Sequence, residues 1–208
     1  MIVIDEKEKE AFHLETDPYT QFNKWFQEAI SAGESKADAF ALATSTPQGY
    51  PNVRFLLFKG MHEGQFLFFT NYHSPKATEL LNCPWAAMAF HWPSLGRQVR
   101  IQGRVKKTSA EISQNYFHSR SKGSQISATA SPQGQVVPSR QTLEEKWNRV
   151  EAEYKIQENL PCPSYWGGFQ LAPDRIEFWQ ERADRFHDRF LYLPVPASAE
   201  WTIHRLSP

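Results

Sequence analysis

The apolar positions that follow Asp17 recur at the spacing of an α-helix. Asp17 suits the capping position of such a helix, Pro18 suits its first turn, and Gly33 marks its end. The side chains that repeat at i, i+3, i+4, i+7 and i+8 are Phe22, Trp25, Phe26, Ala29 and Ile30. The pattern predicts one amphipathic helix before the rest of the fold.

From Ala39 the period changes to that of β-strands. Residues 39–46, 52–60 and 65–71 are short runs rich in aliphatic and aromatic side chains, and Pro/Gly or Glu/Gly turns separate them. Three short strands in succession indicate an antiparallel meander.

The remaining segments follow the same two periods. Helical patterns cover 74–81, 109–120 and 142–157, and strand patterns cover 85–92, 97–105, 166–173, 175–181, 185–193 and 201–206. Residues 121–139 are rich in Ser, Gly and Pro and are expected to form a long loop, either functional or disordered. Together these elements predict an α+β, mainly antiparallel fold, a β-barrel of Greek-key type with peripheral helices. We expect a mobile N-terminal tail over residues 1–16 and a single domain over 17–208.

Composition narrows the class of protein. The chain has 208 residues, with 23 Lys and Arg against 23 Asp and Glu, so no excess of charge suggests a nucleic-acid or membrane partner. The acidic start does not fit a signal peptide, and no apolar run is long enough to span a membrane, so we expect a cytoplasmic protein. Cys83 and Cys162 are isolated and offer no metal-binding spacing.

Cations and hydroxyls beside predicted turns and helix starts are the candidates for chemistry. Such placement is typical of phosphate recognition, and the sequence has none of the motifs of Rossmann, P-loop, zincin or α/β-hydrolase proteins. Arg54 and Lys59 should face opposite sides of one strand, which favours a solvated edge. In contrast, Arg185, His187 and Arg189 should share one strand face, where three basic groups need an anion or an acidic partner. This favours a binding surface at least as much as a solvated face, with neutralisation by Glu177 and Asp188 as the alternative.

Other candidates have a plainer interpretation. The basic face formed by Arg100, Gln102 and Arg104 is more typical of a solvated sheet than of a nucleic-acid surface. Trp166, Trp179 and Trp201 are more typical of core or interface anchors than of cofactor platforms.

Several motifs together resemble one family. RFLLFKG, FFTNYHSPKA, RQVRIQG, YFHSRSKGSQI, SYWGGFQLAPDRIEFWQ, RFHDRF and WTIHRLSP occur in the order and spacing of the pyridoxine (pyridoxamine) 5′-phosphate oxidases. The resemblance extends from about Asp17 to Pro208. It implies an FMN-binding split barrel and a homodimer with flavin at the subunit interface. It also implies oxidation of pyridoxine or pyridoxamine 5′-phosphate to pyridoxal 5′-phosphate with reduction of O2 to hydrogen peroxide.

The resemblance also implies site residues, matched one position at a time. The flavin set is Arg54, Phe55, Leu56, Leu57, Phe58, Lys59, Phe69, Thr70, Lys76, Gln98, Gln133, Trp179 and Arg189, with the last three expected from the other subunit. Lys59, Tyr116, Arg120 and Ser124 are expected to hold the substrate phosphate. Arg185 and His187 are the expected catalytic pair, with Arg185 packed on the pyridine ring and His187 within reach of the ring hydroxyl.

The chain departs from the family pattern at three places. Pro75 stands where an arginine is usual, Gly134 stands where a serine is frequent, and the N-terminal tail is short. Two alternative functions stay open: a split-barrel flavin oxidase for another substrate, of the phenazine-precursor type, and a non-catalytic flavin or pyridoxal-phosphate binding protein. A nucleic-acid module on the strand from Arg97 to Lys107 is the weakest alternative.

Overall fold

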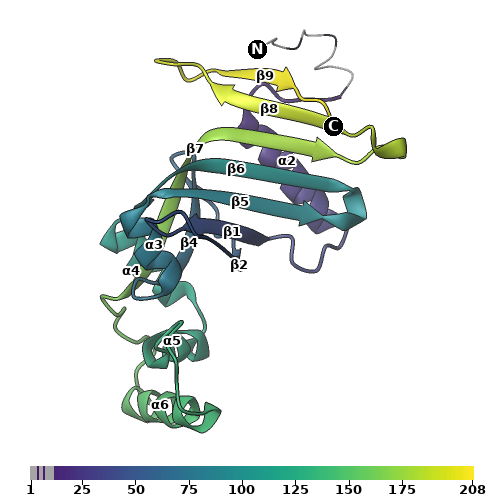
Figure 1. Cartoon of the computed structure of the whole chain (residues 1–208). Coiled ribbons are helices and arrows are strands. Elements are labelled where there is room, and N and C mark those ends of the chain that lie inside the picture. The colour runs from purple at the N-terminus through teal and green to yellow at the C-terminus, as the bar shows by residue number, and fades with distance from the viewer. Residues whose placement is uncertain (1–3, 5–6, 8–11) are drawn as a thin grey trace.

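The computed structural model describes residues 4, 7 and 12–208 and is built on one large antiparallel sheet (Figure 1). Its strand order is β2-β1-β5-β6-β7-β4-β3, and β8 and β9 continue it beyond the second half of β7. The strands are β1 (Ala39–Ser45), β2 (Pro51–Leu57), β3 (Met61–His62), β4 (Gln65–Asn71), β5 (Trp85–Trp92), β6 (Arg97–Lys107), β7 (Trp166–Gln180), β8 (Asp188–Pro194) and β9 (Trp201–Arg205). The predicted α+β, mainly antiparallel class is confirmed.

β7 is the strand that joins the two halves of the sheet. The first half of β7 pairs with β4 and its second half with β8. On the other side, β6 pairs with β7 from Phe169 to Gln180. The sequence pattern predicted two strands here, and the structure has one. Pro173 does not break β7 because the β6 register shifts between Gln102 and Gly103. A Cβ on Gly103 would lie 2.0 Å from the Ala172 carbonyl oxygen, so the bulge needs glycine.

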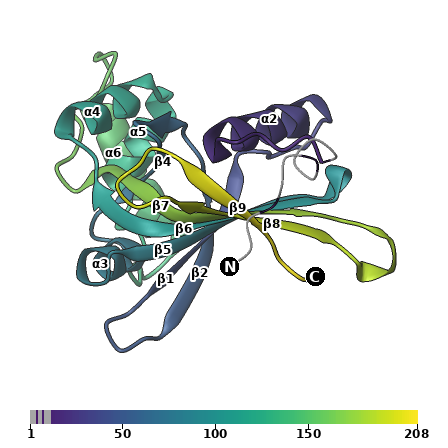
Figure 2. The same cartoon turned by 90° about the horizontal axis from the view of Figure 1, so that it is seen from above.

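Helix α2 (Pro18–Ser31) covers one face of the sheet, as Figure 2 shows. The Asp17 carboxylate accepts a hydrogen bond from the Thr20 backbone N–H at 3.0 Å, which confirms the predicted cap. Phe22 is fully buried and its ring lies 5.0 Å from Phe66 and 5.1 Å from Phe90. Ile30, predicted on the same buried face, is instead 49% exposed, because it lies at the end of the helix beyond the sheet contact.

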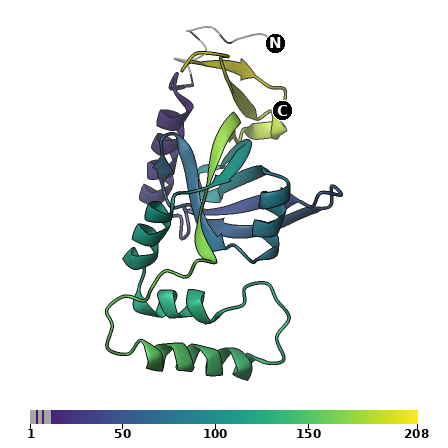
Figure 3. The same cartoon turned by 90° about the vertical axis from the view of Figure 1, so that its left-hand side faces the viewer.

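A second, smaller core lies under the remaining helices, and its buried residues are Phe117, Ile126, Leu160 and Trp166. The helices are α3 (Pro75–Asn82), α4 (Ala110–Ser119), α5 (Lys122–Ala130) and α6 (Arg140–Glu153). Figure 3 shows α5 and α6 side by side, away from the sheet.

Helix α5 corrects the prediction of a loop over residues 121–139. The Ser121 hydroxyl accepts a hydrogen bond from the Ser124 N–H and caps the helix, and Ile126 is anchored in the smaller core. These two features outweigh the Ser- and Gly-rich composition of the segment.

Part of the predicted tail packs against the C-terminal strands. The Phe12 ring lies 5.2 Å from Phe190, and the Tyr192 hydroxyl donates to the Glu15 carbonyl at 2.8 Å. The predicted mobility concerns residues that lie mostly outside the described ones, so it stays a prediction.

Candidate active site

A pocket of about 690 Å³ opens where β2, the end of β4, α4 and α5 meet. It brings together ten of the residues that the sequence nominated. They are Phe55, Leu56, Leu57, Lys59, Phe69, Thr70, Tyr116, Arg120, Ser124 and Gln133.

Stacked aromatic rings form one wall of this pocket. Phe69 lies 3.9 Å from Tyr116 and 5.6 Å from Trp166, in each case with nearly parallel rings. Phe69 reaches this position from β4, Tyr116 from α4 and Trp166 from the start of β7. Trp166 was interpreted as a core anchor, and it is 7% exposed, but it also lines the pocket.

Arg120 lies at the end of α4 over this aromatic wall. Its guanidinium carbon is 4.8 Å from the centre of the Trp166 ring. Its Nη1 atom is buried and has no hydrogen-bond partner among the described residues. Burial lowers the pKa of Arg120, although Tyr116 and Cys162 act in the opposite direction. A buried guanidinium N–H without an acceptor is what an anionic ligand would satisfy.

Hydroxyl groups surround Arg120 at the junction of α4 and α5. Ser119, Ser121, Ser124 and Ser127 all line the pocket, and the Ser121 and Ser124 hydroxyl oxygens are 2.9 Å apart. The sequence nominated only Ser124 of these. Ser121 could have been found from its place as the cap of a helix. The sequence pattern predicted a loop here, so no cap was expected.

Lys59 faces the same pocket from the segment after β2. Its ammonium forms an ion pair with Asp38 at 2.9 Å, and both side chains stay partly exposed. The prediction that Lys59 lies on a solvated strand edge is therefore incomplete, because its side chain has a carboxylate partner and also lines the pocket.

Lys76 lies in the first turn of α3, is 8% exposed and binds Thr70 and Gln133 of the pocket lining. Its ammonium donates to the hydroxyls of Thr70 and Ser74 and to the side-chain oxygen of Gln133, at 3.2–3.3 Å. Burial, followed by repulsion from Arg54, lowers the pKa of Lys76, and Glu79 partly offsets this shift.

Gln133 is supplied by the same chain as Lys76. The Thr70 hydroxyl donates to its side-chain oxygen at 2.8 Å, and the Asn71 backbone N–H donates to that oxygen at 3.3 Å. This corrects the expectation that Gln133 arrives from the other subunit. The loop after α5 returns to α3 and β4 of its own chain.

Pro75 and Gly134, two of the departures from the family pattern, are in contact. Gly134 has φ +81°, and a Cβ on it would lie 2.5 Å from Cδ of Pro75. The missing side chain at 134 is therefore a packing requirement of the proline at 75.

Arg54, on β2, lies close enough to Lys76 to repel it. It forms an ion pair with the buried Glu79 of α3 at 3.3 Å and donates to the Thr44 hydroxyl and the Leu42 carbonyl. Phe58, also nominated, is 6% exposed and belongs to the main core rather than to the lining of the pocket.

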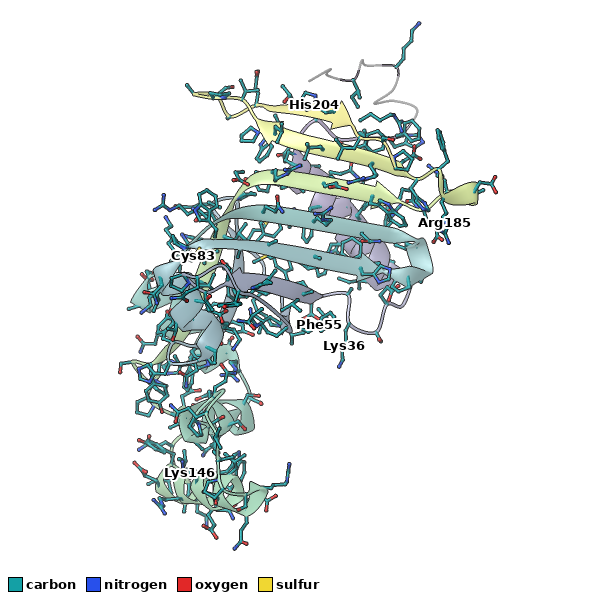
Figure 4. All side chains as sticks on the ribbon, in the orientation of Figure 1. Lys36, Phe55, Cys83, Lys146, Arg185 and His204 are labelled. Atoms are coloured by element: carbon teal, nitrogen blue, oxygen red, sulfur yellow. The ribbon has the colours of Figure 1, made fainter. Side chains whose placement is uncertain are left out.

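The remaining nominated residues lie at the β6–β8 end of the sheet. Gln98 pairs with Trp179, Trp179 pairs with Arg189, and the Trp179 ring is 4.5 Å from His187. Figure 4 shows Arg185 in this region, well separated from Phe55 at the pocket. One chain therefore does not unite Gln98, Trp179, Arg185, His187 and Arg189 with the pocket.

The shared strand face predicted for Arg185, His187 and Arg189 is wrong. β8 begins only at Asp188, and Arg185 lies in a 3-10 turn with φ +61° next to Asp184 with φ +55°. Only Arg189 lies on the strand, where it forms an ion pair with Glu177 at 2.8 Å. The turn reverses the chain direction before the strand period resumes.

Comparisons with known proteins show the family of the chain. Residues 26–154 match the family model described as "Pyridoxamine 5'-phosphate oxidase". The chain is 45% identical to the pyridoxine/pyridoxamine 5'-phosphate oxidase of Salinibacter ruber over 94% of this chain and 91% of that protein. It is 50% identical to the enzyme of the same name from Burkholderia cenocepacia over 92% and 89%. The chain belongs to the pyridoxine/pyridoxamine 5′-phosphate oxidase family.

Solved structures agree with this membership and confirm the split-barrel fold. PhzG from Burkholderia lata, solved with tetrahydrophenazine-1-carboxylic acid, has a TM-score of 0.87 at 27% identity, over 93% of this chain and 94% of that one. An FMN binding protein from Nostoc punctiforme related to pyridoxamine 5'-phosphate oxidase has a TM-score of 0.72 at 21% identity, over 89% and 96%.

The C-terminal part of the chain carries a second match. Residues 166–208 match the model described as "Pyridoxine 5'-phosphate oxidase C-terminal dimerisation region", which supports a homodimer. That region contains Trp179, Arg185, His187 and Arg189. Among the described helices, none has the length and apolar character required to cross a membrane.

Proposed function

We propose that this chain oxidises pyridoxine or pyridoxamine 5′-phosphate to pyridoxal 5′-phosphate, with FMN as cofactor and O2 as electron acceptor. The observation that carries the proposal is Arg120, a buried guanidinium with an unpaired N–H, set among serine hydroxyls above stacked aromatic rings. This combination suits a planar ligand that carries a phosphate.

FMN is the cofactor, and the residues around Lys76 fit its phosphate. Lys76 is a buried cation whose partners among the described residues are neutral oxygens, and Arg54 lies beside it. When bound, FMN would supply the redox chemistry, with N5 as the acceptor of the hydride from substrate C4′ and O2 as the final electron acceptor. Phe55, Leu56, Leu57, Phe69 and Thr70, which line the pocket, would hold the ribityl chain and the ring edge.

The chain's own residues orient the substrate. Lys59, Tyr116, Arg120 and Ser124 would hold its phosphate, remote from the reacting carbon, and thereby fix the pyridine ring against the flavin. Arg185 would pack a planar cation against that ring.

His187 would donate a hydrogen bond to the ring oxygen. The Arg182 backbone N–H donates to Nδ1 of His187 at 3.2 Å, so the neutral imidazole carries its proton on Nε2. Nε2 is then the nitrogen that could donate to a substrate oxygen, which agrees with an orienting role.

A homodimer would bring the two groups of residues together. Val53 and Phe55 on the edge strand β2 are 69% and 78% exposed, which is unusual for neighbouring apolar side chains. Cover by a second copy would bury this surface. We propose that Gln98, Trp179, Arg185, His187 and Arg189 of one subunit complete the pocket of the other. A cytoplasmic location stays a prediction.

The likeness to PhzG supports one alternative, an oxidase of phenazine precursors. The pocket sets Arg120 and Lys59 among several serine hydroxyls, and this many donors favours a phosphate, which has more acceptor oxygens than the one carboxylate of a phenazine precursor. A non-catalytic binder of flavin or pyridoxal phosphate would bind both ligands but transfer no electrons.

A peroxide assay on the purified chain loaded with FMN tests the proposal. We expect hydrogen peroxide and pyridoxal 5′-phosphate in equal amounts from at least one B6 phosphate, and bleaching of the flavin when that substrate is added without oxygen. A normal flavin spectrum with no peroxide from either B6 phosphate would reject the proposal. Peroxide from a dihydrophenazine carboxylate alone would favour the first alternative, and tight binding without bleaching the second.

A further inference from the structure

Glu79 is a buried carboxylate that no part of the proposed reaction uses. It lies in the second turn of α3 and is 7% exposed. Its two oxygens accept hydrogen bonds from Asn52 at 2.6 Å, from Arg54 at 3.3 Å and from the Thr44 hydroxyl. Residues of β1, β2 and α3 therefore converge on one anion.

The charges around Glu79 do not balance. Arg54 and Lys76 are two cations with little exposure to solvent. Burial lowers the pKa of Lys76, repulsion from Arg54 lowers it further, and attraction to Glu79 partly offsets the shift. Among the described side chains that bind either cation, Glu79 is the one carboxylate. The cradle formed by Arg54, Lys76 and Glu79 therefore keeps a net positive charge of one.

We propose that Glu79 is the internal counter-anion of this cradle, which stabilises it when no phosphate is bound and opposes the phosphate when one is bound. The inference rests on the proposed function, because it takes the FMN phosphate as the ligand of Arg54 and Lys76. Two buried like charges without a counter-charge are costly, so Glu79 keeps the apoprotein folded. The same negative charge must repel a phosphate dianion placed against Lys76.

The substitution Glu79→Gln tests this inference, because glutamine keeps the shape and removes the charge. We expect the apoprotein of the variant to melt at a lower temperature than wild type. We expect FMN to raise the melting temperature by more than in wild type, and its affinity to rise by about threefold or more. The dependence of FMN affinity on salt should become steeper, a change that loss of packing alone would not produce.

Two matched variants control for other effects. Thr44→Val removes a neutral hydrogen bond to Glu79 but leaves the charge, so it should not increase the stabilisation by FMN. Glu144→Gln removes a carboxylate from an exposed ion pair with Arg140 on α6, far from the cradle, and should change neither quantity. Inorganic phosphate, used alone as a second probe, should also stabilise Glu79→Gln more than wild type.

Three outcomes would overturn the inference. Weaker FMN binding together with lower stability would mean that Glu79 only orients Arg54. Unchanged stability and affinity would mean that its charge has no effect. A variant that folds neither alone nor with FMN present would mean that phosphate cannot replace the missing charge. A wild-type chain that binds FMN but oxidises neither B6 phosphate would refute the proposed function and leave the Glu79 measurement valid.

Discussion

Arg120 and Arg189 show how differently the two ends of the molecule treat a cation. At the pocket, Arg120 is buried and keeps an N–H group without a partner among the described residues. At the β6–β8 end, Arg189 is fully engaged by the Glu177 carboxylate and by the Ser207 carbonyl, which accepts from Nη1 at 3.0 Å. The cation at the pocket therefore keeps a donor for a ligand, whereas Arg189 at the β6–β8 end is held by groups of its own chain.

Mixed dimers test most directly whether the two ends of the molecule have different roles. If the pocket of one subunit is completed by His187 of the other, Arg120→Ala and His187→Ala should each be nearly inactive alone. Mixed by subunit exchange, they should recover about a quarter of wild-type activity, because half of the dimers then carry one native site. Peroxide production at a substrate concentration near the wild-type KM measures this.

The control for that experiment mixes two variants of the same end. Arg120→Ala with Lys59→Ala leaves every mixed site with one substitution, so no recovery is expected. Recovery in this control, or none in the first mixture, would contradict a site shared between subunits.

Arg120→Ala alone should separate substrate binding from cofactor binding. Loss of two charge-assisted hydrogen bonds, each worth about 1.5–3 kcal/mol, should raise the KM for the B6 phosphates by at least about a hundredfold. The affinity for FMN should change by less than about threefold, since the cradle at Lys76 is built by other residues. Steady-state kinetics and FMN titration measure the two quantities.

Arg104→Ala is the matched control, because Arg104 is an exposed cation on β6. It should leave both constants unchanged. Equal losses of substrate and FMN binding in Arg120→Ala would show that the two phosphates do not have separate pockets.

Most helices and strands were predicted correctly from the sequence, and the errors have a physical cause. The 3.6-residue period gave α2 and the period of two gave the strands, because each depends on neighbours in the chain. α5 was missed because Ser121 as a cap and Ile126 as a buried anchor are invisible in a Ser- and Gly-rich composition. β7 was divided in error because the irregularity beside Pro173, where Asp174 has no partner on β6, is defined only by the pairing of the two strands.

The candidate site shows the same limit. The cations were predicted, and so was Glu177 as a possible partner of the group that includes Arg189. Asp38 and Glu79, which bind Lys59 and Arg54, were not predicted. Each of these carboxylates meets its cation only through strand pairing or helix packing. Sequence spacing therefore located the charges but not their balance.

Lys76→Met should weaken FMN binding about tenfold, the equivalent of one hydrogen bond to a charged group. Its effect on the apoprotein should be the reverse of most core substitutions. Burial holds the pKa of Lys76 below its usual value, so folding disfavours the charged form, and its removal should leave the melting temperature equal or higher.

Fluorescence titration of the apoprotein with FMN and thermal melting without it measure these effects, with Lys106→Met on the exposed face of β6 as the control. A fall in melting temperature with unchanged FMN affinity would mean that Lys76 serves the fold rather than the ligand.

Gly134→Ala should cause the smallest loss of FMN affinity, and we expect this loss to come from the contact with Pro75. The added Cβ would meet Cδ of Pro75 at 2.5 Å in a backbone conformation with φ +81°, so the loop must shift and carry Gln133 away from Lys76. We expect FMN affinity to fall about fivefold, for a strain of roughly 1 kcal/mol.

Combining this substitution with Pro75→Ala separates the two sources of strain in Gly134→Ala. Pro75→Ala alone should be nearly neutral, and in the double variant it should restore part of the lost affinity, because the clash disappears while the strain of positive φ remains. FMN titrations of the four proteins give the coupling between the two positions. Strictly additive losses would show that the residues at 75 and 134 act independently, and that Gly134 is needed for its backbone conformation alone.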